Sequence, residues 1–229
     1  MNEKDELILL NSWASPFGAR VRIAMAEKGI NQYELREEDL FSMSPLLLKM
    51  NPVHRKVPVL IHNGKPICES MNIVQYINEV AVFNGKPALL PPDPYSRSKA
   101  RFWADFIDQK DRLWVYGTMR KITRNRGEEQ VRAKEELIET LKVLERELGE
   151  KPYFGGEFGF VDIALVPFYS RFYAVETLGN FRIEAECPKL VAWARRCLLK
   201  ETVSNSLPDP LKVYEWVLYV NDKFGIKQN

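Results

Sequence analysis

The stretch NPVHRKVPVLIHNGKPICES (residues 51–70) predicts two short strands joined by a tight turn. Pro58 heads an apolar run, where a proline must lie at the start or the edge of a strand. Asn63 and Gly64 supply the two positive φ angles that a tight hairpin turn needs. The chain is then expected to return as a second short strand over residues 66–68.

A helix is expected directly after this hairpin. Glu69 and Ser70 open it, and residues 71–80 carry apolar side chains at helical spacing. Backbone groups near Val57 are expected to stay unpaired, and the free N–H groups after Ser70 favour a carboxylate. This arrangement is typical of a cleft for a small extended peptide, although an ordinary hairpin followed by a capped helix explains each signal taken alone.

Composition and charge exclude several classes of function. The chain has 229 residues and a net charge of only +2, so nucleic-acid binding has no electrostatic support. No apolar run approaches the length of a membrane span, and the acidic N-terminus is not a signal peptide. Cys68, Cys187 and Cys197 lack metal-ligand spacing and are odd in number. We therefore expect a cytoplasmic protein without a metal and without a nucleic-acid or membrane partner.

The pattern before residue 84 alternates strands and helices, which indicates an α/β domain. Apart from the hairpin and its helix, the expected elements are a strand over 7–10, a helix over 16–28, a strand over 32–36 and a helical turn over 45–49. The segment 84–94 is rich in proline and is expected to be a linker. The predicted domains are therefore 1–83 and 95–229.

The second domain is expected to be all helical. Its helical patterns cover residues 95–121, 128–148, 161–177, 188–199 and 210–224. The third is apolar nearly all round and should be the buried central helix. Asp162, three residues after Gly159, is expected to accept hydrogen bonds at the start of that helix and to help to nucleate the domain, with no part in chemistry.

Ser15 lies between the first strand and the first helix. It has two interpretations: the cap of a helix whose first turn holds Pro16, or a hydroxyl that donates to a thiolate in the cleft beside Val57. A free thiol has a pKa of about 8.5, so a donor at a helix N-terminus raises the thiolate fraction at neutral pH. In the second interpretation the serine stabilises the sulfur of another molecule.

Several segments together resemble soluble glutathione transferases, most closely the plant tau class, over essentially the whole chain. The matching segments are WASPFGARVRIAMAEKG, EEDL, SPLLLKMNPVHRKVPVLIHNGKPICES, VQYI, ARFWADFID, FGFVDIAL and SLPDP. The resemblance implies a thioredoxin-like N-terminal domain with a cis peptide bond before Pro58, an all-helical C-terminal domain and a homodimer. It also implies that glutathione is the co-substrate and that its thiolate attacks hydrophobic electrophiles in detoxification and the stress response, with peroxide reduction left open.

The same resemblance assigns residues to the glutathione site. Ser15 would hydrogen-bond the thiolate, and the Val57 backbone would pair with the cysteinyl unit. Glu69 and Ser70 would bind the γ-glutamyl end, and Lys56 would lie near the glycine carboxylate. Relatives of this fold that perform thiol-disulfide exchange need a cysteine at the position of Ser15. Because this chain has a serine there, conjugation is expected rather than thiol-disulfide exchange.

Three further residues qualify this assignment. Arg20 and Asp108 match residues that form a network with the γ-glutamyl site, although an ordinary ion pair explains them nearly as well. Met43 stands where the tau pattern has a lysine that faces the glycine carboxylate. The missing lysine predicts glutathione affinity below the class norm, by roughly tenfold or more, since a charge-assisted hydrogen bond contributes about 1.5–3 kcal/mol. Lys56, Arg55 or His54 would compensate in part.

The electrophile site is expected to be apolar and to lie between the domains. Its candidate residues are Ala14, Phe17, Arg112, Tyr116, Met119, Trp216 and Val220. Each of them is about as well explained by ordinary packing. The alternative function is a carrier of hydrophobic ligands with little or no turnover, because fold alone does not separate carriage from catalysis.

Overall fold

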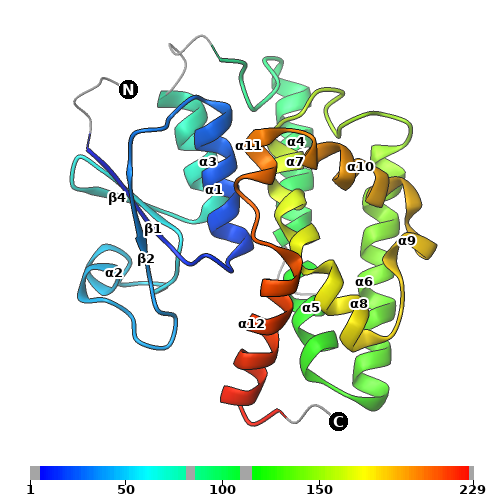
Figure 1. Cartoon of the computed structure of the whole chain (residues 1–229). Coiled ribbons are helices and arrows are strands. Elements are labelled where there is room, and N and C mark those ends of the chain that lie inside the picture. The colour runs from blue at the N-terminus through cyan, green and yellow to red at the C-terminus, as the bar shows by residue number, and fades with distance from the viewer. Residues whose placement is uncertain (1–5, 81–85, 109–114, 227–229) are drawn as a thin grey trace. The chain divides into compact units, whose positions relative to one another are not determined.

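The computed structural model describes residues 6–80, 86–108 and 115–226. The chain divides into two units, Met1–Arg97 and Ser98–Asn229, with the boundary inside helix α4 (Pro94–Asp108) (Figure 1). The expected domain limits at residues 83 and 95 stay a prediction.

The first unit is built on a four-stranded mixed sheet with the strand order β2-β1-β3-β4. Strand β1 (Leu7–Asn11) pairs in parallel with β2 (Glu34–Glu37) and antiparallel with β3 (Val59–His62), and β3 forms a hairpin with β4 (Lys65–Cys68). The predicted strands are confirmed, although β2 begins two residues after the expected position 32. A parallel pair needs a crossover connection, and helix α1 (Pro16–Glu27) provides it.

Side chains of β1 alternate between the two faces of the sheet. Ile8 and Leu10 pack with Leu47 of helix α2 (Pro45–Met50) in one buried cluster. Leu9 is fully buried and points to the opposite face, where α1 (Pro16–Glu27) and α3 (Ser70–Val80) pack against each other (Figure 1). These layers form the thioredoxin-like unit that the sequence predicts.

Local backbone features of the hairpin agree with the sequence. The peptide bond between Val57 and Pro58 is cis, as the resemblance implies. Asn63 and Gly64 have φ angles of 49° and 75°, the left-handed values that the tight turn requires. The turn prediction is therefore confirmed at the level of individual dihedral angles.

The predicted linker is packed against the first unit over its described part. Leu89 and Leu90 are buried, and the Leu89 N–H donates to Oδ1 of Asn78 at 2.7 Å. Nζ of Lys28 donates to the carbonyl of Pro87 at 3.0 Å. Burial lowers the pKa of this lysine. Residues 84 and 85 lie outside the described residues.

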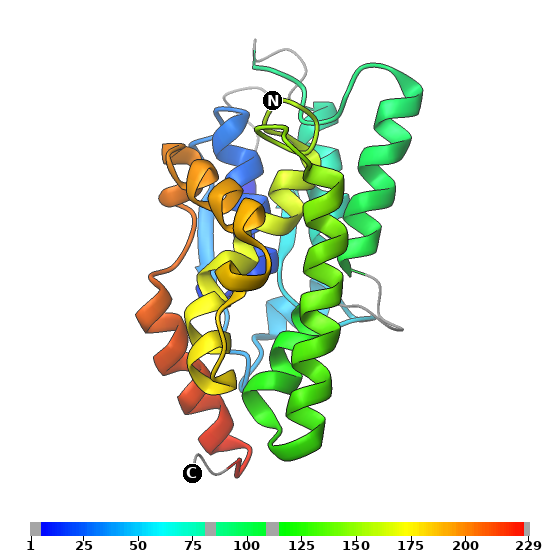
Figure 2. The ribbon, with the colours of Figure 1, turned by 90° about the vertical axis from the view of Figure 1, so that its right-hand side faces the viewer.

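The described part of the second unit is all helical, as predicted. Its elements after α4 are α5 (Val115–Arg124), α6 (Gly127–Leu148), α7 (Phe160–Leu165), the 3₁₀ helix η2 (Val166–Arg171), α8 (Phe172–Gly179), α9 (Ile183–Glu186), α10 (Pro188–Leu198), α11 (Glu201–Ser204) and α12 (Pro210–Lys223). The long α6 runs beside α5 (Figure 2). None of the described helices combines the length and the apolar character that a membrane crossing needs.

Two of the expected helices are each replaced by shorter helices in the structure. The single helix expected over residues 161–177 is wrong, because the chain forms α7, η2 and α8 in succession. Pro167 has no N–H for a bond to the carbonyl four residues earlier, and its ring crowds that carbonyl, so the α-helix ends before it. Burial is confirmed for α7 and most of η2, whereas Tyr173 and Thr177 of α8 are exposed. The helix expected over 95–121 appears as α4 and α5, and residues 109–114 between them lie outside the described residues.

Asp162 forms the predicted cap at the start of α7. Its Oδ2 accepts the Gly159 N–H at 3.0 Å, and its Oδ1 accepts the Phe154 N–H at 3.2 Å and Nε1–H of Trp193 at 2.7 Å. The side chain is almost fully buried, and this burial raises its pKa to about 6. The carboxyl group therefore joins α7, the preceding loop and α10.

Candidate functional site

Ser15 is the N-cap residue of α1. Its Oγ accepts the Gly18 N–H at 3.2 Å, and Pro16 occupies the first turn, so the capping interpretation is confirmed. Accepting this bond uses one lone pair of the hydroxyl and leaves its proton for another acceptor. A half-buried hydroxyl at the positive end of a helix is suited to stabilising a thiolate.

The segment before β3 presents the backbone of Val57. Neither its N–H nor its C=O makes a hydrogen bond with another described residue, because the β3–β4 pairing begins at Val59. The buried Asn51 holds the segment in place: its Nδ2 donates to the Lys56 carbonyl at 2.9 Å, and its Oδ1 accepts the His54 N–H at 3.2 Å. An extended peptide can add to the sheet at this position.

Glu69 precedes α3 in a left-handed conformation, with φ 69°. Residues other than glycine rarely adopt this conformation, and it persists only where the surrounding structure holds it. Nδ1 of His54 lies 2.5 Å from Oε1 of Glu69 and so holds the carboxylate from the neighbouring loop. The Glu69 side chain is still 61% exposed, which leaves it accessible to an ammonium group.

Ser70 is buried at the first turn of α3. Its Oγ accepts a hydrogen bond from Nη1 of Arg20 at 3.1 Å. The Arg20 side chain is completely buried on α1, and its guanidinium lies over the ring of Phe17 at 5.1 Å. This bond joins α1 to α3, and because Ser70 is the acceptor, its hydroxyl proton is not used in it. The N–H groups in the first turn of a helix are suited to binding an anion.

The other predicted glutathione-binding residues lie on exposed loops. Lys56 is exposed just before Val57, and Met43 is 39% exposed just before α2. Asp108 is the last residue of α4, in the second unit. The roles assigned to Met43, Lys56 and Asp108 stay predictions.

The predicted electrophile residues belong to both units. Ala14 and Phe17 flank Ser15 in the first unit, and Arg112 lies outside the described residues. Met119 of α5 is 2% exposed and packs in the core, whereas Tyr116, on the same helix, is only half-buried. The remaining two candidates, Trp216 and Val220, are half-buried on α12. Their grouping in one site stays a prediction.

The pKa of each of the three cysteine thiols is raised, which disfavours the reactive thiolate form. Burial raises the pKa of the Cys187 thiol to about 12 and that of Cys197 in the same direction. Burial and the neighbouring Glu69 carboxylate raise the pKa of Cys68. Within residues 6–80, 86–108 and 115–226, His, Cys, Asp and Glu side chains form no group of three that could hold a metal.

Two contributions to the site were missed from the sequence. Asn51 had a detectable signal, because asparagine side chains often bond the backbone of their own loop. The contact of His54 with Glu69 had none: it joins residues fifteen positions apart on a loop and a helix start. The sequence offers His54 as a polar loop residue or as a partial substitute for the lysine that Met43 replaces, and neither interpretation pairs it with Glu69.

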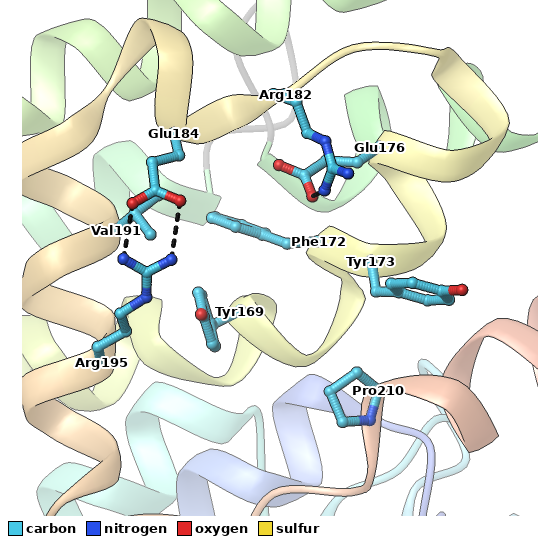
Figure 3. Close-up of a pocket in the computed structure, with 9 residues that line it drawn as sticks. All are labelled: Tyr169, Phe172, Tyr173, Glu176, Arg182, Glu184, Val191, Arg195 and Pro210. Carbon is cyan, nitrogen blue, oxygen red and sulfur yellow. Dashed lines mark hydrogen bonds and ion pairs between the residues drawn. The ribbon is translucent and has the colours of Figure 1, made fainter.

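A separate pocket of about 450 Å³ lies within the second unit (Figure 3). Its lining consists of Tyr169, Phe172, Tyr173, Glu176, Arg182, Glu184, Val191, Arg195 and Pro210. Arg195 forms a two-pronged ion pair with Glu184 at 2.6 and 2.8 Å, and Arg182 lies 3.7 Å from Glu176. The pocket therefore carries balanced charge, and none of the predicted electrophile residues line it.

Comparisons with known proteins cover nearly the whole chain. Residues 5–79 match the family Glutathione S-transferase, N-terminal domain, and residues 103–196 match Glutathione S-transferase, C-terminal domain. The probable glutathione S-transferase parC of Nicotiana tabacum is 60% identical over 97% of this chain and 99% of its own length. Glutathione S-transferase U19 of Arabidopsis thaliana is 56% identical over 96% of this chain and 98% of its own length.

The chain is also similar to solved structures of glutathione S-transferases. The rice glutathione S-transferase OsGSTU1, solved in complex with glutathione, is 48% identical with a TM-score of 0.90, over 98% of this chain and 100% of that one. The tau-class enzyme from mango, Mangifera indica, is 39% identical with a TM-score of 0.86, over 94% of this chain and 98% of that one.

Proposed function

Because this chain belongs to the glutathione S-transferase family, and its relatives include tau-class enzymes, we propose that Ser15 activates glutathione for attack on hydrophobic electrophiles. The enzyme is a glutathione transferase, and glutathione is its co-substrate. The observation that carries the proposed role is the Ser15 hydroxyl, which caps α1 as an acceptor and keeps its own proton to donate.

The first unit offers one recognition group for each part of glutathione. The unpaired Val57 backbone suits the cysteinyl unit. The exposed Glu69 carboxylate suits the γ-glutamyl ammonium, and the Ser70 hydroxyl with the first turn of α3 suits its carboxylate. The glycine carboxylate would meet the Lys56 side chain, with Met43 supplying no charge.

The proposed chemistry is thiolate attack. A hydrogen bond from the Ser15 hydroxyl stabilises the thiolate relative to the thiol and so lowers the pKa of the glutathione thiol. Binding both reactants also replaces a bimolecular encounter by a local one. On the helical unit, Tyr116 of α5 and Trp216 and Val220 of α12 are proposed to contact the electrophile; their half-buried state supports this.

A carrier without turnover is not favoured. The relatives that cover nearly the full chain are named as transferases. The Ser15 hydroxyl is also a hydrogen-bond donor for a thiolate, and a carrier of hydrophobic ligands does not need such a donor.

Assembly into a homodimer is part of the proposal. Val53, in the loop after α2, is 82% exposed, and Phe102 on α4 is 56% exposed. Both side chains are accessible to a partner subunit, and we propose that the dimer buries them. Analytical ultracentrifugation should therefore find a dimer, and Val53→Lys or Phe102→Glu should shift it toward the monomer.

The test of the proposed reaction is conjugation of 1-chloro-2,4-dinitrobenzene at several glutathione concentrations. Ser15→Ala removes the donor, and loss of a preorganised donor costs about 10²-fold in turnover. Ser44→Ala is the matched control, because Ser44 caps α2 by accepting the Leu47 N–H at 3.0 Å. Both variants lose a cap, about 1 kcal/mol of stability, but only Ser15→Ala should lose turnover.

Equal, negligible rates in the wild type and Ser15→Ala, with tight binding of a hydrophobic dye, would instead establish a carrier. Full turnover in Ser15→Ala would refute the role of the hydroxyl.

A further inference from the structure

Three arginines and a tyrosine gather on the second unit in a group that we call the arginine cluster: Tyr116, Arg120, Arg124 and Arg171. Tyr116, Arg120 and Arg124 follow one another at four-residue spacing on α5 and therefore share a face. Arg171 joins them from η2. Its guanidinium lies 5.1 Å from the centre of the Tyr116 ring, and that of Arg120 lies 5.8 Å from the same ring.

The arginine cluster differs in its ion pairing from Lys121, the next residue on the same helix. Nζ of Lys121 lies 3.0 Å from Oε2 of Glu136 on α6, in an ordinary exposed ion pair. Arg120 and Arg124, by contrast, form no ion pair with any carboxylate in the described ranges. They face aromatic rings instead: Arg120 that of Tyr116, and Arg124 that of Phe224 at 5.0 Å.

The charges of the cluster repel one another in a partly desolvated place. Arg171 is buried, and burial lowers its pKa; Tyr116 acts against this shift, and the Arg120 charge adds to it. Burial also lowers the pKa of Arg124, with Arg120 and Arg171 acting in the same direction. The C-terminal end of α5 favours Arg124 through the helix dipole, but that explanation extends neither to Arg120, which precedes the last turn, nor to Arg171 on η2.

An anion would relieve this repulsion, and apolar side chains lie beside the cations. The ring of Phe168 is 6.3 Å from that of Tyr116. The guanidinium fork matches the geometry of a carboxylate, which it can bind through two parallel hydrogen bonds. A ligand with both an aromatic body and a carboxylate therefore fits the two kinds of group present.

We propose that the arginine cluster binds the carboxylate of aromatic electrophiles, so that the enzyme prefers anionic electrophiles to neutral ones of the same shape. This inference rests on the proposed function, because Tyr116 belongs to the proposed electrophile site. The net charge of only +2 excludes a general excess of basic residues as the reason for the cluster.

The test compares two aryl halides of nearly equal shape, 4-chloro-3,5-dinitrobenzoate and 4-chloro-3,5-dinitrobenzamide. Calorimetry without glutathione measures the affinity of the full chain for each compound. The wild type should bind the benzoate about tenfold more tightly than the benzamide, since a charged hydrogen-bonding group is lost in the amide. Added salt should weaken only benzoate binding.

Arg120→Gln and Arg124→Gln are the informative variants, because both side chains reach the surface and their replacement spares the core. At least one of them should lower benzoate affinity by about tenfold and leave benzamide affinity unchanged. Lys121→Gln is the matched control: it removes one charge from the same helix and should leave both affinities unchanged.

Equal wild-type affinities for the two compounds would overturn the proposal. An effect of Lys121→Gln as large as that of the arginine variants, or no effect of either arginine variant, would also overturn it. Conjugation of the benzamide is measured in parallel. If the benzamide were not conjugated, the proposed function would be contradicted. The calorimetric comparison tests carboxylate binding by the arginine cluster independently of conjugation.

Discussion

The imidazole of His54 holds the carboxylate of Glu69, with Nδ1 2.5 Å from Oε1. The two residues belong to the two segments that we propose bind glutathione, the loop before β3 and the start of α3. Both side chains are about half exposed, 47% for His54 and 61% for Glu69. The contact therefore orients an accessible carboxylate rather than burying an ion pair.

Replacing His54 should weaken glutathione binding without slowing the chemical step. An ordinary hydrogen bond contributes about 0.5–1.5 kcal/mol, so His54→Ala is expected to raise KM for glutathione by about two- to tenfold with kcat unchanged. His62→Ala is the control, since the chain has only two histidines and His62 Nδ1 contacts the Tyr76 hydroxyl at 2.6 Å. An unchanged KM in His54→Ala would show that Glu69 needs no support from the loop.

Restoring a positive charge at position 43 should improve glutathione binding. Met43 is 39% exposed, so a lysine there would remain hydrated and screened by salt. We expect Met43→Lys to tighten glutathione binding by several-fold, up to about tenfold, with the gain largest at low ionic strength. Unchanged binding in a calorimetric titration at low salt would rule out a deficit at the glycine end.

Arg20 and Ser70 should be energetically coupled. The bond between Nη1 and Oγ is 3.1 Å long and buried, and its donor is charged, so a coupling of about 1.5–3 kcal/mol is expected. A double-mutant cycle of Arg20→Met and Ser70→Ala, measured by chemical denaturation, isolates this coupling. Strictly additive effects would mean that the bond does not stabilise the packing of α1 against α3.

Asp162 should make stability depend on pH. Its pKa is about 6 in the folded protein against 3.8 ordinarily, so between these values the folded state keeps a proton that the unfolded state releases. This contribution is full below about pH 4 and is lost as pH rises through about 6; it amounts to at most about 3 kcal/mol.

The non-titrating variant Asp162→Asn tests this dependence. The stability difference between wild type and variant, from denaturation at pH 4, 5, 6 and 7, should shrink as pH rises to 6 and then level off. A difference that grows with pH would mean that the three N–H donors outweigh burial and that the folded pKa lies below its ordinary value.

Most secondary structure could be predicted because its causes are local. A proline at the first helical position and a serine just before it mark the start of α1 and α2. Asn63 and Gly64 specify a turn through their own dihedral preferences. The one clear error, the helix over 161–177, arose because the apolar pattern outweighed Pro167, a break that is also local.

The site could be predicted only in part. Ser15, Val57 and the helix start at Ser70 follow from the junctions in which they lie, and the resemblance supplied the role of Glu69. Their supporting contacts join α1 to α3, in the case of Arg20, and a loop to a helix start, in the case of His54. No spacing rule within one element connects such positions.

Local sequence thus specifies the strands, the turn and the helix caps, because each depends on dihedral preferences and hydrogen bonds within a few residues. The Arg20–Ser70 bond, the His54–Glu69 contact and the arginine cluster depend on which faces the packed elements present to each other. Packing is cooperative across segments far apart in the chain, so these contacts exist only once the elements have assembled.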